Sequence, residues 1–222
     1  MSGDTQDWFW LTLFLLGAYH GVNPGMGWLF AVALGMQENS GRAVGLALLP
    51  LGLGHMLAVG AVVGLAWLAR IILPLAVLRV AAAAILLAFG VYFLLRKKHF
   101  SWGGMRVGFA DLTVWGFLMA SAHGAGLMVL PVLLGAMGDA SAAAAATHEL
   151  SHKPPPTPAL AGPWLAAAVV GVHLAGYVVI AGAVAWLVYA KLGLALLRTA
   201  WINLDLVWAV ALVVSGVVVL VL

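Results

Sequence analysis

The sequence predicts an all-α membrane protein in which six transmembrane helices form two three-helix repeats of inverted topology. Of its 222 residues, 65% are hydrophobic and only 8% are charged, which lies far outside the composition of soluble domains. A helix needs roughly 20 apolar residues to cross a bilayer. The chain therefore has room for about six such helices, and a lipid bilayer is the expected partner.

Six apolar segments, each long enough to span, are separated by short polar connections. The predicted spans are residues 8–36, 43–69, 73–95, 112–137, 164–190 and 197–222. We divide the chain into a first repeat at 1–98, a basic cytoplasmic linker at 99–111 and a second repeat at 112–222. The second repeat contains a long loop at 138–163, rich in alanine, proline and histidine, which we expect outside the membrane.

Basic residues predict the orientation, because loops rich in lysine and arginine remain in the cytoplasm. The side we assign to the cytoplasm carries Arg42, Arg96, Lys97, Lys98, Arg106 and Lys191, whereas the other side carries only Arg70 and Lys153 in its loops. Six spans then place both termini outside a bacterial-type inner or plasma membrane. The net charge of +3 is explained by these loops, so no nucleic-acid partner is expected.

The two halves resemble each other in the order and depth of their polar residues. "GAYHG" in the first segment aligns with "ASAHG" in the fourth, and "LGLGHMLAVGAVV" in the second aligns with "VVGVHLAGYVVIAGAV" in the fifth. The aligned pairs are His20 with His123, His55 with His173 and Arg79 with Arg198. Three-span repeats enter the membrane from opposite sides, which is the inverted-repeat plan of many secondary transporters.

The four aligned histidines each lie roughly 15–18 Å into their segments, near the middle of the membrane. Ionisable residues at that depth usually face the bundle interior and mark a path for an ion or substrate. Because the chain has no cysteine, a metal would be held by nitrogen, oxygen or thioether ligands. We therefore predict that His20, His55, His123 and His173 bind a transition metal, with Ni, Co, Zn, Cu and Fe not distinguished. The alternative is that each histidine forms a hydrogen bond across a helix interface, to a backbone carbonyl group or to a serine or threonine.

Two further polar residues are candidate auxiliary ligands or proton-coupling groups. Pro24 lacks an N–H group, so it is expected to break the first segment and to leave the carbonyl oxygen of His20 free. Asn23 lies beside that break and could contact a bound ion, or could satisfy the freed carbonyl instead. Asp205 carries a carboxylate inside the sixth predicted span. It could couple proton movement to transport, bind the ion, or pair with an arginine.

Weaker candidates lie near these residues or in the long loop. Met26 and Met56 could supply thioethers to Cu(I), although methionine in a membrane core is more often apolar filler. His148 and His152 have i, i+4 spacing in "THELSHK" and could capture a cation, although a solvated loop is the simpler interpretation.

The stretch "GAYHGVNPGMGW", taken with the repeat, resembles the broad lysine-exporter superfamily, and in particular its nickel/cobalt transporters. The first-helix motif of those proteins is G-x-x-H-(A/G)-x-x-P-(D/G)-H, and the matching positions are Gly17, His20, Gly21, Pro24 and Gly25. The sequence departs from the motif at Met26, where its second histidine would stand. The resemblance implies a metal path with His20 as a ligand.

Transport of a transition-metal cation is therefore the function that the sequence favours. The sequence has no nucleotide-binding motif, so the energy would come from a gradient or an energising partner protein; a homo-oligomer is also left open. A membrane-embedded metalloenzyme or haem protein using the same histidines is the first alternative, for which no catalytic residue is assigned. Export of a small organic or oxyanionic solute is the second.

Overall fold

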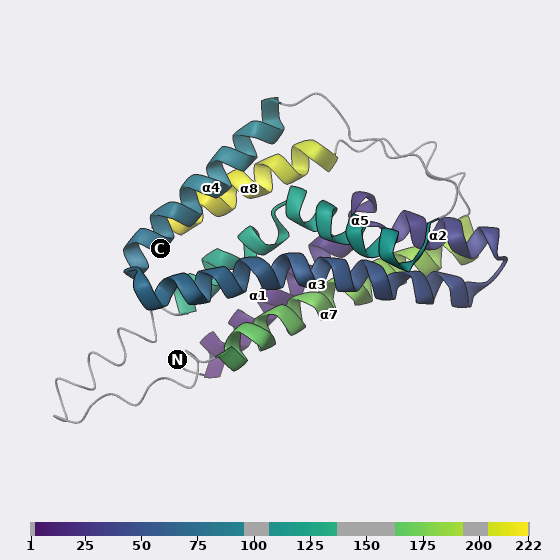
Figure 1. The fold of residues 1–222 in the computed structure, drawn as a ribbon, viewed down its shortest axis with the longest axis horizontal. Helices are drawn as coiled ribbons and strands as arrows, with labels where there is room; N and C mark the ends of the chain where they lie inside the picture. Colours follow the sequence, from purple (N-terminus) through teal and green to yellow (C-terminus); the bar gives the residue numbers. More distant parts are fainter. Residues whose placement is uncertain (1–2, 96–106, 137–162, 193–203, 222) are drawn as a thin grey trace.

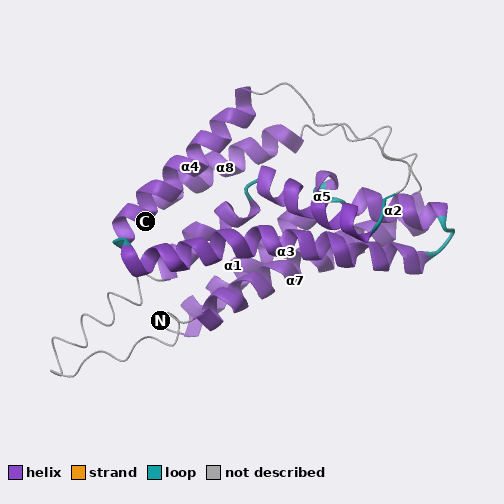
Figure 2. Ribbon diagram, viewed as in Figure 1, coloured by secondary structure: helices purple, strands orange, loops and turns teal. Residues whose placement is uncertain are grey.

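A computed structural model describes residues 3–95, 107–136, 163–192 and 204–221, and all regular structure in these ranges is helical (Figures 1 and 2). The elements, in chain order, are α1 (Gly3–Val22), the 3₁₀ turn η1 (Pro24–Met26), α2 (Trp28–Gln37), α3 (Gly41–Ile72), α4 (Leu75–Leu95), α5 (Phe109–Ala122), the helical segment Ala125–Ala136, α7 (Pro163–Leu187), the π-helical turn η3 (Val188–Leu192) and α8 (Leu204–Val221). The predicted all-α class is confirmed over these ranges.

Within the described residues, three helical stretches are long and apolar enough to cross a bilayer: Gly41–Ala69, Leu75–Tyr92 and Trp164–Lys191. A fourth span results if α5 and Ala125–Ala136, which meet at 57°, are taken together. Large apolar side chains such as Leu65 and Ile71 point away from the helices, and this suits contact with lipid. These features are consistent with an integral membrane protein.

The first and fourth predicted segments are each broken rather than continuous. The first segment becomes α1, η1 and α2, because Pro24 cannot donate a backbone hydrogen bond and Gly27 has a φ of 109°. The fourth segment bends between α5 and Ala125–Ala136, where Gly124 has a φ of 68°. Both breaks follow closely after a histidine.

Helices from the two halves of the chain pack in pairs: α1 lies along α7, α3 along α5 and α4 along α8 (Figure 1). Glycines allow the first two pairs to approach closely. A Cβ atom on Gly17 would overlap the carbonyl oxygen of His173, and one on Gly176 would overlap that of Phe14. Between α3 and α5, Gly54 and Gly116 lie against the partner backbone in the same way.

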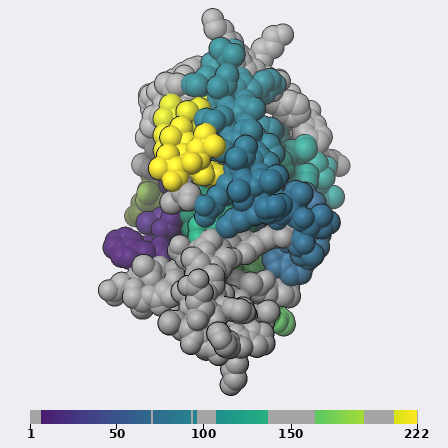
Figure 3. Space-filling model, turned by 90° about the vertical axis from the view of Figure 1, so that its left-hand side faces the viewer, coloured from purple at the N-terminus to yellow at the C-terminus, as the bar shows by residue number. Residues whose placement is uncertain are grey.

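The α4 and α8 pair lies beside α1, α3, α5 and α7, which form the four-helix part of the molecule (Figure 1). Figure 3 shows α8, in yellow, next to α4 on one side of the molecule. Gly90 of α4 packs against Val213 of α8, and Gly216 of α8 packs against Leu87 of α4. This pair touches the bend at Gly124, because a Cβ there would meet the Leu212 side chain 2.8 Å away.

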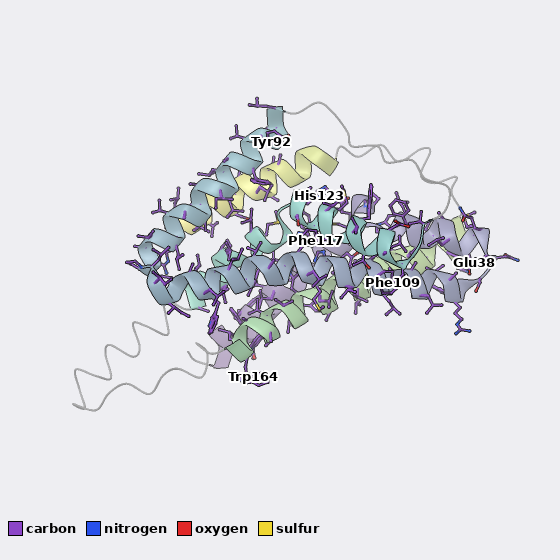
Figure 4. All side chains as sticks on the ribbon, in the orientation of Figure 1. Glu38, Tyr92, Phe109, Phe117, His123 and Trp164 are labelled. Atoms are coloured by element: carbon purple, nitrogen blue, oxygen red, sulfur yellow. The ribbon has the colours of Figure 1, made fainter. Side chains whose placement is uncertain are left out.

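The start of α3 and the ends of α2 and α7 lie together at one end of the molecule. Gly41 lies against Trp186, and Gly35 against Tyr189, so Arg42 and Lys191 are at the same end. Figure 4 places Glu38 and Phe109 at this end and Trp164 at the other. The basic residues Arg42 and Lys191 are therefore grouped as the loop charges predict.

Candidate functional site: a buried histidine cluster

Three histidines from three helices meet inside the four-helix part of the molecule. His20 of α1, His55 of α3 and His173 of α7 are 0%, 1% and 0% exposed. Their ring centroids are 5.6 Å apart for His20 and His55, 5.2 Å for His20 and His173, and 5.3 Å for His55 and His173. Three of the four predicted ligands thus form one nearly equilateral triangle, which we call the histidine triangle.

The histidine triangle has the size of a site for one ion. Imidazoles that share a tetrahedral ion with a metal–nitrogen distance of 2.0–2.1 Å have ring centroids about 5 Å apart. All three separations are close to this value. The size alone would therefore permit a single ion to reach all three rings.

The ring orientations differ from those of a loaded site. The planes of His55 and His173 are within 8° of parallel, whereas the plane of His20 makes 68° with each of them. The lone pairs of an imidazole lie in its ring plane, so two stacked parallel rings do not aim at one point. Over the described ranges, no group of three or more His, Cys, Asp or Glu side chains is arranged to hold a metal ion.

Backbone contacts fix the tautomer of His20. Its Nδ1 lies 2.7 Å from the carbonyl oxygen of Leu16, which can only accept, so Nδ1 carries the proton and donates it. The neutral ring then has its lone pair on Nε2. His123 makes the same contact, with Nδ1 2.8 Å from the carbonyl oxygen of Met119. The tautomer that presents Nε2 as a ligand is thus set in both residues.

Several buried nitrogen atoms at the triangle have no hydrogen-bond partner in the protein. They are both ring nitrogens of His55, both ring nitrogens of His173, and Nδ2 of Asn23. The carbonyl group of Leu13 lies close enough to the His173 ring to interact with it, so the His55 and Asn23 nitrogens are the clearest unpaired groups. Leaving such groups unsatisfied costs about 1–3 kcal/mol each, and buried polar groups in native proteins are nearly always paired. The triangle is therefore suited to hold a polar or charged guest.

The helix break beside His20 is well ordered by local hydrogen bonds. Asn23 caps η1, because its Oδ1 accepts from the backbone N–H of Gly25 at 2.8 Å. The backbone N–H of Asn23 donates to the carbonyl oxygen of His20 at 3.2 Å. The prediction that this carbonyl stays free is therefore wrong, and the alternative, in which Asn23 satisfies it, is confirmed, because the chain turns tightly enough for the backbone N–H of Asn23 to reach it.

Three aromatic side chains donate to the carbonyl groups of this break. Trp28 Nε1 donates to Val22 O at 3.0 Å, Trp115 Nε1 donates to Gly25 O at 3.3 Å, and the Tyr177 hydroxyl donates to Met26 O at 2.8 Å. The donors come from α2, α5 and α7. Irregular backbone is tolerated at membrane depth only where such partners exist.

Tyr177 was missed by the sequence reasoning, although it carries a signal. It lies four residues after His173 in an otherwise apolar helix, so both side chains share one face of α7. Its ring is 1% exposed and stacks on His55, with centroids 4.2 Å apart and planes 2° apart. A polar aromatic residue at this spacing from a buried histidine could have been flagged.

His123 lies next to the triangle but is not part of it. It is half-buried at the bend after α5, and Figure 4 shows it far along α5 from Phe109. Its Cε1 is 3.7 Å from the position that a Cβ of Gly25 would take. His123 thus flanks the helix break at Gly25.

The remaining predicted residues are less informative. Met26 is buried in η1, and Met56, which follows His55 in the sequence, is half-buried. Asp205 is the second residue of α8, and its side chain lies outside the described part of the structure. The structure does not describe His148, His152, Arg198, most of the 99–111 linker or residues 138–162 of the long loop.

Comparisons of the chain with protein-family models, with curated proteins and with solved structures find no match.

Proposed function

We propose that this protein transports a transition-metal cation across the membrane and that His20, His55 and His173 form the site for the ion. One observation carries the proposal: three fully buried imidazoles from three helices lie at the mutual distances of ligands to one ion. Neutral imidazole is a good ligand for Zn, Cu, Fe, Ni and Co, and its use requires no cysteine. The ion is the cargo of the protein rather than a resident cofactor.

The unpaired ring nitrogens support a site that binds an ion reversibly. A permanently packed core would pair the nitrogens of His55 and His173 with protein groups, because unpaired buried nitrogens lower stability. A transport site has to tolerate the empty state as well as the loaded one. Asn23, whose Oδ1 is committed to Gly25, adds an Nδ2 group that suits a water or anion accompanying the ion.

We further propose that the chain has six spans arranged as two inverted repeats. Exchange of the two halves would turn the α1 and α7 pair into the α5 and α3 pair, and would leave the α4 and α8 pair unchanged; this is the observed set of pairs. His20 and His123, equivalent in the two repeats, donate to the carbonyl four residues earlier and precede a break. These parallels support the repeat.

In this plan, the ion site lies between the repeats, where secondary transporters place their substrates. His123 would be an auxiliary ligand on the approach to the histidine triangle, since it is half-buried and flanks the break at Gly25. Asp205 remains a candidate proton-coupling residue. The energy source would be a gradient or a partner protein.

Ion uptake into proteoliposomes tests the proposed function. Wild-type protein should carry Co²⁺ or Zn²⁺ into vesicles that contain a metal-sensitive dye, and the His20→Leu and His173→Leu variants should not. Tyr92→Phe, an exposed site on α4, is the control for reconstitution. Equal uptake by wild-type and both histidine variants would exclude the triangle as the ion site, and a lack of uptake by wild-type protein down an imposed gradient of the ion would contradict the proposed function.

A further inference from the structure

Two contacts hold the Tyr177 side chain, one at its hydroxyl group and one along the face of its ring. At one end, its hydroxyl donates to the carbonyl oxygen of Met26 in η1, at 2.8 Å. Along its face, its ring stacks on His55 at 4.2 Å with the planes 2° apart. The side chain is 1% exposed, so neighbouring groups leave the ring little freedom to move. Tyr177 therefore connects the helix break directly to one member of the histidine triangle.

The stack determines how the His55 imidazole is oriented. His55 is within 2° of parallel to Tyr177 and within 8° of parallel to His173, which lies one helical turn before Tyr177 on α7. His55 and His173 can share an ion only if one of these rings tilts, so that the two ring planes intersect. A tilt of His55 would break its face-to-face contact with Tyr177.

We propose that Tyr177 is a positioning residue that holds His55 in the orientation of the empty site and thereby weakens the binding of the ion. This inference rests on the proposed function, in which the triangle binds a transition-metal cation. The stack stabilises the empty site and is lost when His55 turns to the ion. Its free energy therefore opposes loading and favours release, which a transporter requires at the end of each cycle.

The sign of the effect separates this role from a merely structural one. If Tyr177 only supported the fold, its removal would loosen the triangle and weaken ion binding. If Tyr177 restrains His55, its removal frees the ring to turn, and ion binding becomes tighter. A stacked aromatic pair has a free energy that corresponds to a change in affinity of about threefold to tenfold.

Titration of purified protein with Co²⁺ measures this change. Tyr177→Leu removes the ring but keeps an apolar side chain, Tyr177→Phe keeps the ring but removes the hydroxyl bond to Met26, and Tyr92→Phe is the control at an exposed site. Absorbance of the bound Co²⁺ gives the Kd and the ligand field, and a chase with excess chelator gives the dissociation rate.

We expect Tyr177→Leu to lower the Kd for Co²⁺ by about threefold to tenfold and to slow dissociation of the ion. The Co²⁺ absorption spectrum should be unchanged, because the same imidazoles hold the ion. Tyr177→Phe should lower the Kd by about twofold, because a ring without its anchor at Met26 restrains His55 less. Tyr92→Phe should match wild type.

An unchanged or higher Kd in the folded Tyr177 variants would overturn the inference while leaving the proposed function intact. If Tyr177→Leu does not fold, Tyr177→Phe decides the matter by the same criterion. Failure of wild-type protein to bind Co²⁺, or binding by His55→Leu as tight as by wild type, would overturn the proposed function and the inference together.

Discussion

Gly17 of α1 lies directly against the carbonyl group of His173 on α7, so closely that a Cβ at residue 17 would overlap the carbonyl oxygen. Three residues later on the same helix, His20 meets the ring of His173 at 5.2 Å. The close approach of the two backbones is thus what allows two histidines from different halves of the chain to reach each other. The small Gly17 in the interface thus allows the buried His20 and His173 to meet.

We expect Gly17→Val to lower the free energy of unfolding by about 1–3 kcal/mol, because the new side chain meets backbone atoms that cannot move independently. The ion affinity of any folded variant should fall, since α1 must move away from α7. Unfolding in detergent, followed by circular dichroism, measures the first effect.

Gly60→Ala on α3 is the matched control, because a Cβ there would meet nothing within 4 Å. This control should be neutral or slightly stabilising, as expected for alanine in place of glycine in a helix. Equal stability of Gly17→Val and Gly60→Ala would show that the contact between α1 and α7 is looser than described.

We expect His55→Leu to stabilise the ion-free protein while abolishing ion binding. The substitution removes two ring nitrogens that have no partner in the protein, and the gain should be about 1–3 kcal/mol. A residue kept only for packing would behave in the opposite way. Thermal unfolding in the presence of a chelator, with Met56→Leu as the neighbouring control, checks the result; destabilisation by His55→Leu would indicate that its ring nitrogens are satisfied.

We expect Asn23→Ala to destabilise the protein by about 1 kcal/mol, because the Asn23 side chain caps η1 through the N–H of Gly25. Asn23→Asp should retain most of this stability, because a carboxylate oxygen can accept the same hydrogen bond. Urea or heat unfolding of the two variants distinguishes the cap from a general effect of substitution. Equal losses in both variants would argue against the cap.

The absence of cysteine allows the spanning of α3 to be tested by labelling. We expect single cysteines introduced by Glu38→Cys and Ile72→Cys to react with a membrane-impermeant reagent from opposite sides of sealed vesicles. Glu38 precedes α3, and Ile72 ends it at 83% exposure. Labelling of both sites from the same side would contradict a membrane-crossing α3.

The sequence was sufficient to predict the helical class and three members of the triangle, because both depend on strong local signals. A buried histidine is expensive in an apolar segment, so His20, His55 and His173 stood out against leucine and valine. The break at Pro24 was also predictable, because proline cannot donate a hydrogen bond within a helix.

The parts that could not be predicted depend on contacts between distant segments. The hydroxyl of Tyr177 reaches Met26 across 151 positions of the chain, and Trp115 reaches Gly25 across 90. Nor does the spacing of histidines determine ring planes, which set whether His55 and His173 can share an ion. The donor to the carbonyl of His20 was predicted only as one of two roles for Asn23, because the sequence does not show how tightly the chain turns before Pro24.

X-ray absorption of Co²⁺ bound to the purified protein tests the central claim most directly, because it reports how many imidazoles hold the ion. We predict one tightly bound ion per chain with three imidazole ligands, lost in a variant that carries His20→Leu, His55→Leu and His173→Leu together. The same ion content and the same imidazole signal in wild type and in the triple variant would contradict the account.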